Sequence, residues 1–438
     1  MSEMILKGGT LIVPGDSPGV VRAVPGDLAI RSGLILAAGD EGAVPEDFDP
    51  EVIDVSGRLV MPGLVNAHGH AGMTLLRGYA DDLPLMEWLR EHIWPIEAQM
   101  TAEDVEVGTA LAVVEMLLGG TTCFADMYFP MDRVASVVSD MGIRGVLSQG
   151  LIGLDSDVER DMRVSRDFAE KWHEGAGGRI TVQLGPHAAY TCPPEYLERV
   201  ARLASDLGVG IHTHLEETPD ERQNVRGLFG KDPVDCYLEA GIFDSGHVTV
   251  AHGVHLDERA VEVLVEHGVG LAHCPRSNLR LACGIAPVED MLDAGMLVGL
   301  GTDGAASSAT LDMWEEMRFA GYLQKGTRLD ARALPAERLL YLATRGGALA
   351  LGLEDVGELA PGFRADVVVV NLDDARLAPG YDAPSQLAYC AGPSDVERVI
   401  VDGEHLVAGG NLLGHDASEI VLRARAKATE LVERVEDR

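Results

Sequence analysis

Residues 180–215, ITVQLGPHAAYTCPPEYLERVARLASDLGVGIHTHL, contain one complete unit of the architecture that the sequence predicts. The segment begins and ends with short apolar runs, as buried strands do. Between these runs, PEYLERVARLASDLG (194–208) places apolar residues at i, i+3, i+4 and i+7, which is typical of an amphipathic helix. A strand, a helix and a second strand in this order predict a parallel β-α-β unit.

The same alternation continues on both sides of this unit. From residue 62 to about residue 353, amphipathic segments alternate with short apolar runs such as GTTCFAD (120–126), HVTVAHGV (247–254) and LVGLGTDG (297–304). Strands that are apolar on both faces belong to a parallel sheet with helices covering it. The sequence therefore predicts a (β/α)8 TIM barrel, distorted from the ideal form, over residues 61–354.

The two ends of the chain have a different pattern. Residues 1–60 and 355–438 contain short strand-like runs separated by Gly, Pro and Asp turns, including GFRADVVVVNLD (362–373) and VERVIVDGEHLVAGG (396–410). The chain finishes in a charged segment, residues 417–438, that predicts a helix. We expect both ends to pair into one small β-sandwich beside the barrel.

Polar side chains collect where the apolar runs stop. These residues are His68, His70, His212, His214, Glu217, His252, His255 and Asp303. Active sites of (β/α)8 barrels lie at the C-terminal ends of the strands. Four separate strand ends are therefore expected to converge on one mouth.

The spacing of these residues suits a metal ion. His68 and His70 point to the same side of an extended chain and can bind one ion together. His212 and His214 share that spacing, and only one of them need bind, while Asp303 can supply a carboxylate. Three imidazoles and a carboxylate suit zinc or iron(II). A lone HxH pair is more often a pair of buried, hydrogen-bonded histidines, and Asp before Gly is more often a turn. Their joint occurrence at successive strand ends favours the metal site.

Composition excludes several classes of partner. Lysine and arginine number 35 and aspartate and glutamate 70, so the formal net charge is −35. Such a surface repels the phosphates of nucleic acids and of anionic lipids. The N-terminus lacks the features of a signal peptide, and no window approaches about 18 uninterrupted apolar residues. We expect a cytoplasmic protein with no nucleic-acid or membrane partner, whose 6 scattered cysteines are free thiols.

Five motifs resemble the amidohydrolase superfamily. They are PGLVNAHGH (62–70), HTHLEET (212–218), VAHGVHL (250–256), HCPRSNLRLACGIAPV (273–288) and LGTDGAASS (300–308). Within the superfamily they look like the cytosine deaminase and triazine hydrolase branch, closest to the deaminases of methylthioadenosine and S-adenosylhomocysteine. The likeness extends over essentially the whole chain.

The resemblance implies roles for individual residues. The positions that match metal ligands are His68, His70, His214 and Asp303. Glu217 matches the proton-shuttling carboxylate, His252 matches the histidine that acts at the reacting carbon, and Asp303 also takes part in catalysis. His212 receives no role.

The resemblance also bears on the number of metal ions. Two-metal relatives bridge their ions with a carboxylated lysine at a strand end, but Lys171 lies in a helix-like segment and Lys231 in a loop-like one. One divalent ion is therefore expected, with Zn²⁺ preferred and Fe²⁺ as the alternative.

The expected substrate is an adenosine-type nucleoside. By resemblance, Trp88 packs against the nucleoside, Glu97 accepts from the ribose hydroxyls and His187 hydrogen-bonds the purine. Without the resemblance, Trp88 would be interpreted as a core or interface residue and Glu97 as a solvated helix residue. Gln149 stands where relatives often have an arginine that holds the amino-acid carboxylate of S-adenosylhomocysteine, and a neutral amide cannot replace that charge. Methylthioadenosine, 5′-deoxyadenosine and adenosine are therefore favoured over S-adenosylhomocysteine.

Two alternatives remain open. The first is hydrolysis of another amino- or chloro-substituted heteroaromatic ring, such as a triazine, guanine or cytosine, which would keep the metal site without needing Glu97. The second is a metal-binding relative without catalysis, which would have no need of Glu217 or His252. As relatives are commonly dimers or tetramers, a homodimer or homotetramer is expected.

Overall fold

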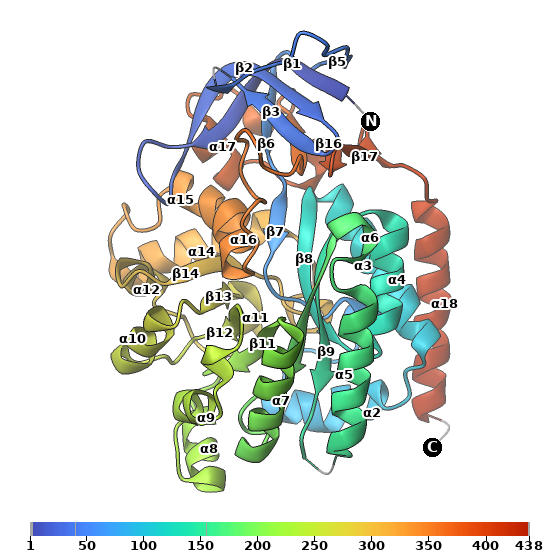
Figure 1. The fold of residues 1–438 in the computed structure, drawn as a ribbon, viewed down its shortest axis with the longest axis vertical. Helices are drawn as coiled ribbons and strands as arrows, with labels where there is room; N and C mark the ends of the chain where they lie inside the picture. The colour runs from blue at the N-terminus through green and yellow to red at the C-terminus, as the bar shows by residue number, and fades with distance from the viewer. Residues whose placement is uncertain (1–2, 40, 155, 437–438) are drawn as a thin grey trace.

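The computed structural model describes residues 3–39, 41–154 and 156–436, which form two separate sheets and the helices around them (Figure 1). Residues 1–2, 40, 155 and 437–438 of the predicted segments lie outside this description. Among the described residues, no helix combines the length and apolar character that crossing a membrane requires.

The larger part of the chain is a barrel of 8 parallel strands that stand in sequence order. The strands are β7 (Leu64–Asn66), β8 (Thr121–Tyr128), β9 (Arg144–Leu151), β10 (Ile180–Pro186), β11 (Gly210–Leu215), β12 (Val248–His252), β13 (Gly270–His273) and β14 (Leu297–Leu300). The backbone N–H of Ala67 donates to the carbonyl of Leu300 at 2.8 Å, which brings the last strand beside the first. The predicted (β/α)8 barrel is confirmed.

Helices fill the connections between strands. They are α1 (Leu85–Glu87), α2 (Trp94–Glu97), α3 (Ala102–Leu118), α4 (Met131–Met141), α5 (Val158–Trp172), α6 (Gly175–Gly178), α7 (Pro194–Leu207), α8 (Glu221–Phe229), α9 (Pro233–Glu239), α10 (Glu258–Glu266), α11 (Pro275–Arg280), α12 (Val288–Asp293), α13 (Ala305–Ser308), α14 (Met313–Arg328), α15 (Ala336–Tyr341), α16 (Gly347–Ala350), α17 (Ala383–Tyr389) and α18 (Ala417–Glu436). Shorter 3-10 or π segments are η1 (Ala71–Leu76), η2 (Trp88–Ile93), η3 (Ile242–Asp244), η4 (Leu342–Gly346), η5 (Ala375–Leu377) and η6 (Pro393–Asp395).

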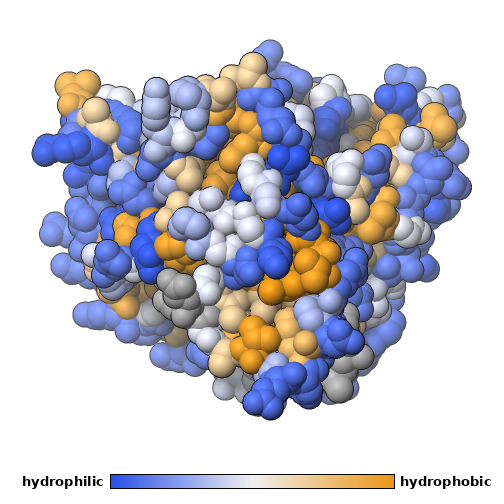
Figure 2. Space-filling model, turned by 90° about the horizontal axis from the view of Figure 1, so that it is seen from above, coloured by the Kyte–Doolittle hydropathy of each residue, from blue (hydrophilic) through white to orange (hydrophobic). Residues whose placement is uncertain are grey.

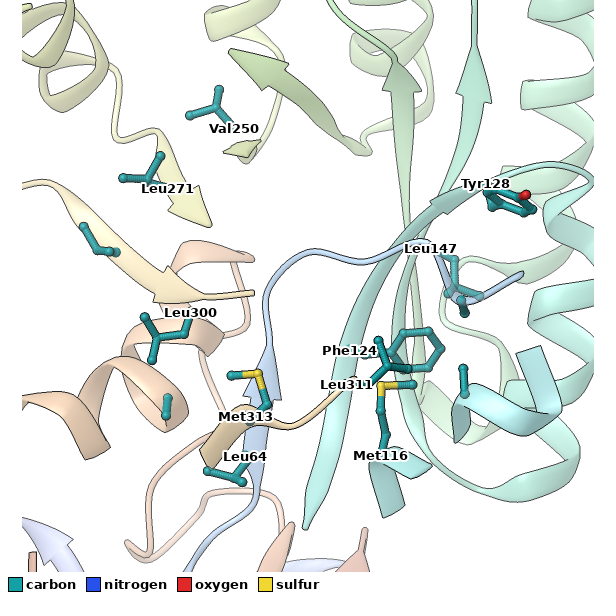
Figure 3. Close-up of a cluster of buried hydrophobic side chains, with 14 of the residues drawn as sticks. Leu64, Met116, Phe124, Tyr128, Leu147, Val250, Leu271, Leu300, Leu311 and Met313 are labelled. Atoms are coloured by element: carbon teal, nitrogen blue, oxygen red, sulfur yellow. The ribbon is translucent and has the colours of Figure 1, made fainter. Parts of the chain in front are cut away.

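The apolar pattern of the sequence accounts for these elements. Every residue of β8 is buried, as expected for a strand covered on both faces. Helix α7 buries only the stripe that faces the barrel, including Leu197, Val200 and Ala204. Side chains such as Leu64, Phe124 and Leu300 belong to the continuous core formed by the barrel strands and their helices (Figure 3).

Both chain ends build the second sheet, which has 10 strands. They are β1 (Glu3–Pro14), β2 (Val21–Arg31), β3 (Leu34–Ala38), β4 (Glu41–Gly42), β5 (Glu51–Asp54), β6 (Arg58–Pro62), β15 (Val367–Asn371), β16 (Val396–Val401), β17 (Glu404–Ala408) and β18 (Asn411–Leu412). The two ends join where β6 pairs antiparallel with β15. Some of their apolar side chains, such as Leu6 and Val367, form a core of their own, while others, such as Leu59 and Val368, belong to the core of the barrel. The predicted pairing of the two ends is confirmed, while the domain limits at residues 60 and 354 stay predictions.

The sheet lies at the N-terminal ends of the barrel strands (Figure 1). Arg144, the first residue of β9, is buried and donates to Asp366 at 2.8 and 3.0 Å and to Asp402 at 2.9 Å. The C-terminal ends therefore open on the side away from the sheet. Figure 2 shows the end of the molecule at which the sheet lies, where hydrophilic residues surround small groups of apolar ones.

Candidate active site

Three histidines meet at the C-terminal end of the barrel. His68 and His70 follow β7, and His214 lies on β11, on the opposite side of the ring of strands. One ligand atom from each of the three lies within 4.8 Å of the others. Asp303, just after β14, places Oδ1 3.3 Å from Nε2 of His70 and 3.6 Å from Nε2 of His68. The structure thus brings together all four residues that the sequence predicts as metal ligands.

Hydrogen bonds leave a ring nitrogen of each histidine free for an ion. Nδ1 of His70 donates to the carbonyl of Met127, and Nδ1 of His214 donates to the carbonyl of His187, both at 2.7 Å. Because a carbonyl only accepts, each of these two rings keeps a proton on Nδ1, and Nε2 is the nitrogen that can bind an ion. Nε2 of His68 is buried and has no hydrogen-bond partner among the described residues. Burial lowers the pKa of His68 to about 3, so this ring is neutral at pH 7.

A divalent cation fits this donor set. An orphaned, buried ring nitrogen is costly unless something binds it, and here it faces two further imidazoles and a carboxylate. Three nitrogen ligands and one oxygen ligand are a common arrangement for zinc and related ions.

Asp303 is held in one orientation by its neighbours. Its Oδ2 accepts hydrogen bonds from Ser277 Oγ at 2.5 Å and Ser307 Oγ at 2.8 Å, and its Oδ1 accepts from the N–H of Gly304 at 2.7 Å. Its φ of 62° is a left-handed conformation that non-glycine residues rarely adopt. Burial alone would raise the pKa of Asp303, but its contacts with His68 and His70 hold that pKa well below its usual range. The carboxylate therefore stays ionised.

Glu217 and His252 face each other beside this cluster. Nε2 of His252 lies 3.8 Å from Oε1 of Glu217. Nδ1 of His252 donates to Oδ1 of Asn278 at 2.9 Å, which directs Nε2 toward Glu217. Burial raises the pKa of Glu217. Two polar groups with a proton-accepting atom each thus lie next to the candidate metal ligands.

The turn that carries Glu217 is fixed by a second glutamate. Glu221, at the start of α8, accepts the backbone N–H groups of Glu216 and Glu217, each at 3.0 Å and each with a different carboxylate oxygen. Glu216 has a left-handed φ of 51°, and its side chain accepts from Arg222 at 3.0 Å. The side chain of Glu221 therefore fixes the backbone turn that carries Glu217, and so fixes the direction in which Glu217 points.

A cavity of about 400 Å³ opens above the cluster. His70, His214, Glu217, His252 and Asp303 line its inner end, and Trp88, Glu97 and His187 line its walls. None of the described residues that line it is lysine or arginine. The cavity therefore suits an aromatic, uncharged ligand with hydrogen-bonding groups.

The wall residues are held by hydrogen bonds. Trp88 is 5 % exposed and its Nε1 donates to the carbonyl of Ala80 at 3.1 Å. Oε1 of Glu97 accepts from the hydroxyl of Tyr128 at 2.6 Å, which leaves its other oxygen available to a ligand. Burial raises the pKa of Glu97.

Gln149 is placed apart from the other predicted residues. Its Oε1 accepts from the backbone N–H of Met131 at 3.2 Å, at the start of α4. It lines a neighbouring cavity of about 290 Å³ that also contains Arg160 and shares Phe129 and Ile152 with the main one. The structure therefore does not bring the amide of Gln149 to the main cavity.

Several residues of the site were not predicted from the sequence. They are Tyr128, Glu221, Ser277, Asn278 and Ser307. Ser277 and Asn278 lie in the motif HCPRSN and Ser307 lies in GAASS, so their position beside recognised motifs was the available signal. For Tyr128, the last residue of β8, the only available signal in the sequence was its position at the end of a strand.

Comparison with known proteins decides the family. The sequence model of the amidohydrolase family matches residues 59–406. This chain belongs to the amidohydrolase family. Its sequence is 48% identical, over 99% of this chain and 100% of the relative, to 5-methylthioadenosine/S-adenosylhomocysteine deaminase of Pelotomaculum thermopropionicum.

Solved structures of similar proteins agree with this assignment. An adenosine deaminase from Xanthomonas campestris with bound zinc has a TM-score of 0.91 and 34% identity, and the match covers 99% of both chains. Atrazine chlorohydrolase from Arthrobacter aurescens, complexed with zinc, has a TM-score of 0.89 and 26% identity over 97% of this chain and 100% of the other. The resemblance read from the motifs is confirmed, and the family together with the histidine cluster supports a divalent metal ion in this amidohydrolase.

Proposed function

We propose that this amidohydrolase is a deaminase that converts the 6-amino group of an adenosine-type nucleoside to a carbonyl oxygen and releases ammonia. The observation that carries the proposal is the carboxylate of Glu217, which lies beside the histidine cluster at the inner end of a cavity lined by Trp88 and Glu97. The relatives named as deaminases of methylthioadenosine and S-adenosylhomocysteine support the same reaction.

The metal site takes one ion held by His68, His70, His214 and Asp303, and we assign it to Zn²⁺ rather than Fe²⁺. The zinc in the similar adenosine deaminase supports this choice. When bound, such an ion lowers the pKa of a water from about 15.7 toward about 7 and so supplies a nucleophile at neutral pH.

The protein's own residues move the protons. Glu217 takes a proton from the attacking water and passes it to a ring nitrogen of the purine, which makes C6 electrophilic. His252, with Nε2 directed by Asn278, stabilises the oxygen that adds to C6. The ionised Asp303 takes the remaining proton of that added hydroxyl and passes it to the departing amine. The C6–O bond forms first, and the C6–N bond then breaks as the C6 carbonyl forms and ammonia leaves.

The cavity walls orient the nucleoside. The ring of Trp88 offers an aromatic face, His187 can hydrogen-bond the purine, and the free oxygen of Glu97 can accept from the ribose hydroxyls. Since none of the described lining residues is lysine or arginine, the pocket favours a short or neutral 5′ group over the charged amino acid of S-adenosylhomocysteine.

The competing function is hydrolysis of another amino- or chloro-substituted heteroaromatic ring. The structural likeness to atrazine chlorohydrolase favours it, because that enzyme has the same overall fold. The role of Glu97 separates the two, since a ring without ribose offers no diol to this carboxylate.

Replacing Glu97 with Gln should lower kcat/KM for methylthioadenosine by about 10–100-fold, because a hydrogen bond to a charged group contributes about 1.5–3 kcal/mol. The amide can still accept from Tyr128, so the wall keeps its shape. Steady-state kinetics with methylthioadenosine and with guanine provide the measurement. If kcat/KM fell equally for both substrates, or did not fall for the nucleoside, Glu97 would have no role in binding the ribose.

Replacing Glu221 with Gln should lower kcat by about 10–100-fold, because an amide cannot accept both N–H groups of the turn and Glu217 shifts from its productive position. Metal content should not change, since the cluster residues are not bonded to Glu221. Glu262→Gln, an exposed change on α10, is the matched control. Wild-type kcat in the Glu221 variant would show that the turn holds without it.

The function itself is tested by ammonia release from the zinc-loaded protein. We expect adenosine, 5′-deoxyadenosine and methylthioadenosine to be turned over with higher kcat/KM than S-adenosylhomocysteine, guanine, cytosine or melamine. A preference for S-adenosylhomocysteine would indicate that a cation outside the main cavity, such as Arg160, reaches its carboxylate. Turnover of free bases or triazines alone would contradict the nucleoside proposal.

A further inference from the structure

His212 contacts a candidate metal ligand from below the site. Its Nε2 lies 2.9 Å from Nδ1 of His68, and both side chains have no exposed surface. The two rings meet edge to face at 65°, with centroids 5.0 Å apart. Because β7 and β11 stand on opposite sides of the ring of strands, this bond crosses the interior of the barrel.

This bond differs from those that hold the other two histidines. Nδ1 of His70 and Nδ1 of His214 each donate to a backbone carbonyl, which only accepts and therefore allows one neutral tautomer. Nδ1 of His68 meets an imidazole nitrogen, which can either accept or donate. The tautomer of His68 therefore depends on the side chain at position 212.

We propose that His212 is a positioning residue for the metal centre, which accepts the Nδ1 proton of His68 and thereby presents the lone pair of His68 Nε2 to the ion. Nε2 of His68 has no other partner among the described residues, and it faces Asp303. The proton of His212 then sits on its own Nδ1, which is buried and has no hydrogen-bond partner in the described part of the chain. The inference rests on the metal-dependent function proposed above.

In this role His212 belongs to the metal site and is more than a packing residue. Partners that hydrogen-bond a metal-binding histidine fix its tautomer and ring direction, and their loss typically lowers metal affinity by about 10–100-fold. Among the described residues, the only hydrogen bond of His68 Nδ1 is the one to His212.

The test compares two amide variants of His212. In His212→Gln the amide oxygen can occupy the position of Nε2 and still accept from His68, whereas in His212→Asn the shorter amide cannot reach it. Zinc affinity is measured by competition with a chromophoric chelator, and the visible spectrum of the cobalt-substituted protein reports ligand geometry. Thermal unfolding of the metal-free forms shows whether each variant is folded.

We expect His212→Asn to bind zinc about 10–100-fold more weakly than the wild type and to change the cobalt spectrum, while His212→Gln stays within a few-fold. His273→Asn is the matched control, because His273 is also fully buried at a barrel strand and neither of its ring nitrogens is bonded to a described residue. It should leave zinc affinity unchanged.

Equal zinc affinity in wild type and His212→Asn would overturn the proposal. So would equal losses in the Asn and Gln variants of His212, since packing rather than the hydrogen bond would then be responsible. Zinc affinity and nucleoside turnover are measured separately, so the two proposals can fail independently. If the variants show the predicted order of zinc affinities but the protein turns over no nucleoside, the role of His212 stands and the proposed function is rejected.

Discussion

Glu217→Gln is expected to lower kcat for methylthioadenosine by about 10²–10⁴-fold, the range typical of losing a general acid–base group. The amide has nearly the same shape as the carboxylate but cannot take a proton from water. KM should change little, because the aromatic and ribose-binding walls of the cavity do not depend on this side chain.

Metal binding should survive this substitution. The clustered nitrogen atoms belong to His68, His70 and His214, so the Gln variant should keep wild-type zinc content by elemental analysis. Glu262→Gln, an exposed change on α10 at a residue that does not line the cavity, is the matched control. Retention of wild-type kcat by the Glu217 variant would remove this residue from the mechanism.

The pH profile offers an independent measurement of the same role. Glu217 must be ionised to accept a proton, and burial raises its pKa above the ordinary value of 4.5. As the pH falls through this raised pKa, Glu217 becomes neutral and kcat/KM should decline. This acidic limb should begin above pH 4.5 in the wild type and be absent from the residual activity of the Gln variant. An unchanged limb in that variant would assign it to another group.

Removal of the metal ion by chelation is expected to abolish turnover, and addition of Zn²⁺ should restore it. Without the ion, no group in the cavity lowers the pKa of water toward neutrality. The loaded protein should also unfold at a higher temperature, because an ion present at about 1,000 times its Kd stabilises the native state by about 4 kcal/mol. Differential scanning calorimetry of both forms gives this shift.

Metal uptake should depend on pH with a definite sign. Burial alone would lower the pKa of His70, but the carboxylate of Asp303 raises it, so the metal-free ring holds a proton at neutral pH. An ion must displace that proton, and apparent zinc affinity should therefore increase as pH rises through neutrality. Asp303→Ala should lose both the affinity and its pH dependence. Full turnover by protein whose metal content is at background would contradict the metal-dependent mechanism.

The barrel was predictable because its evidence is local. A helix such as α7 shows its buried stripe in the spacing of its own residues, and β8 shows its burial in an unbroken apolar run. Parallel strands also bring their C-terminal ends together, so His68, His70, Asp303 and one of His212 and His214 could be grouped without any contact being known. The resemblance to a family then supplied roles for these positions.

Contacts between distant segments were not predictable in the same way. Whether the amide of Gln149 faces the main cavity or the start of α4 depends on a rotamer that the neighbouring backbone of Met131 stabilises. Whether Glu97 is a solvated residue or a half-buried one in the cavity wall depends on Tyr128, which lies on another element.

The sequence of this amidohydrolase was sufficient for the order of strands and helices and for the set of candidate ligands, because periodicity and strand ends are properties of short segments. The partners of those ligands came from the three-dimensional structure. His212 bonds His68 across the barrel, and Ser277 bonds Asp303 from a different loop. Such bonds join residues far apart in the chain, and their geometry exists only once the barrel has closed.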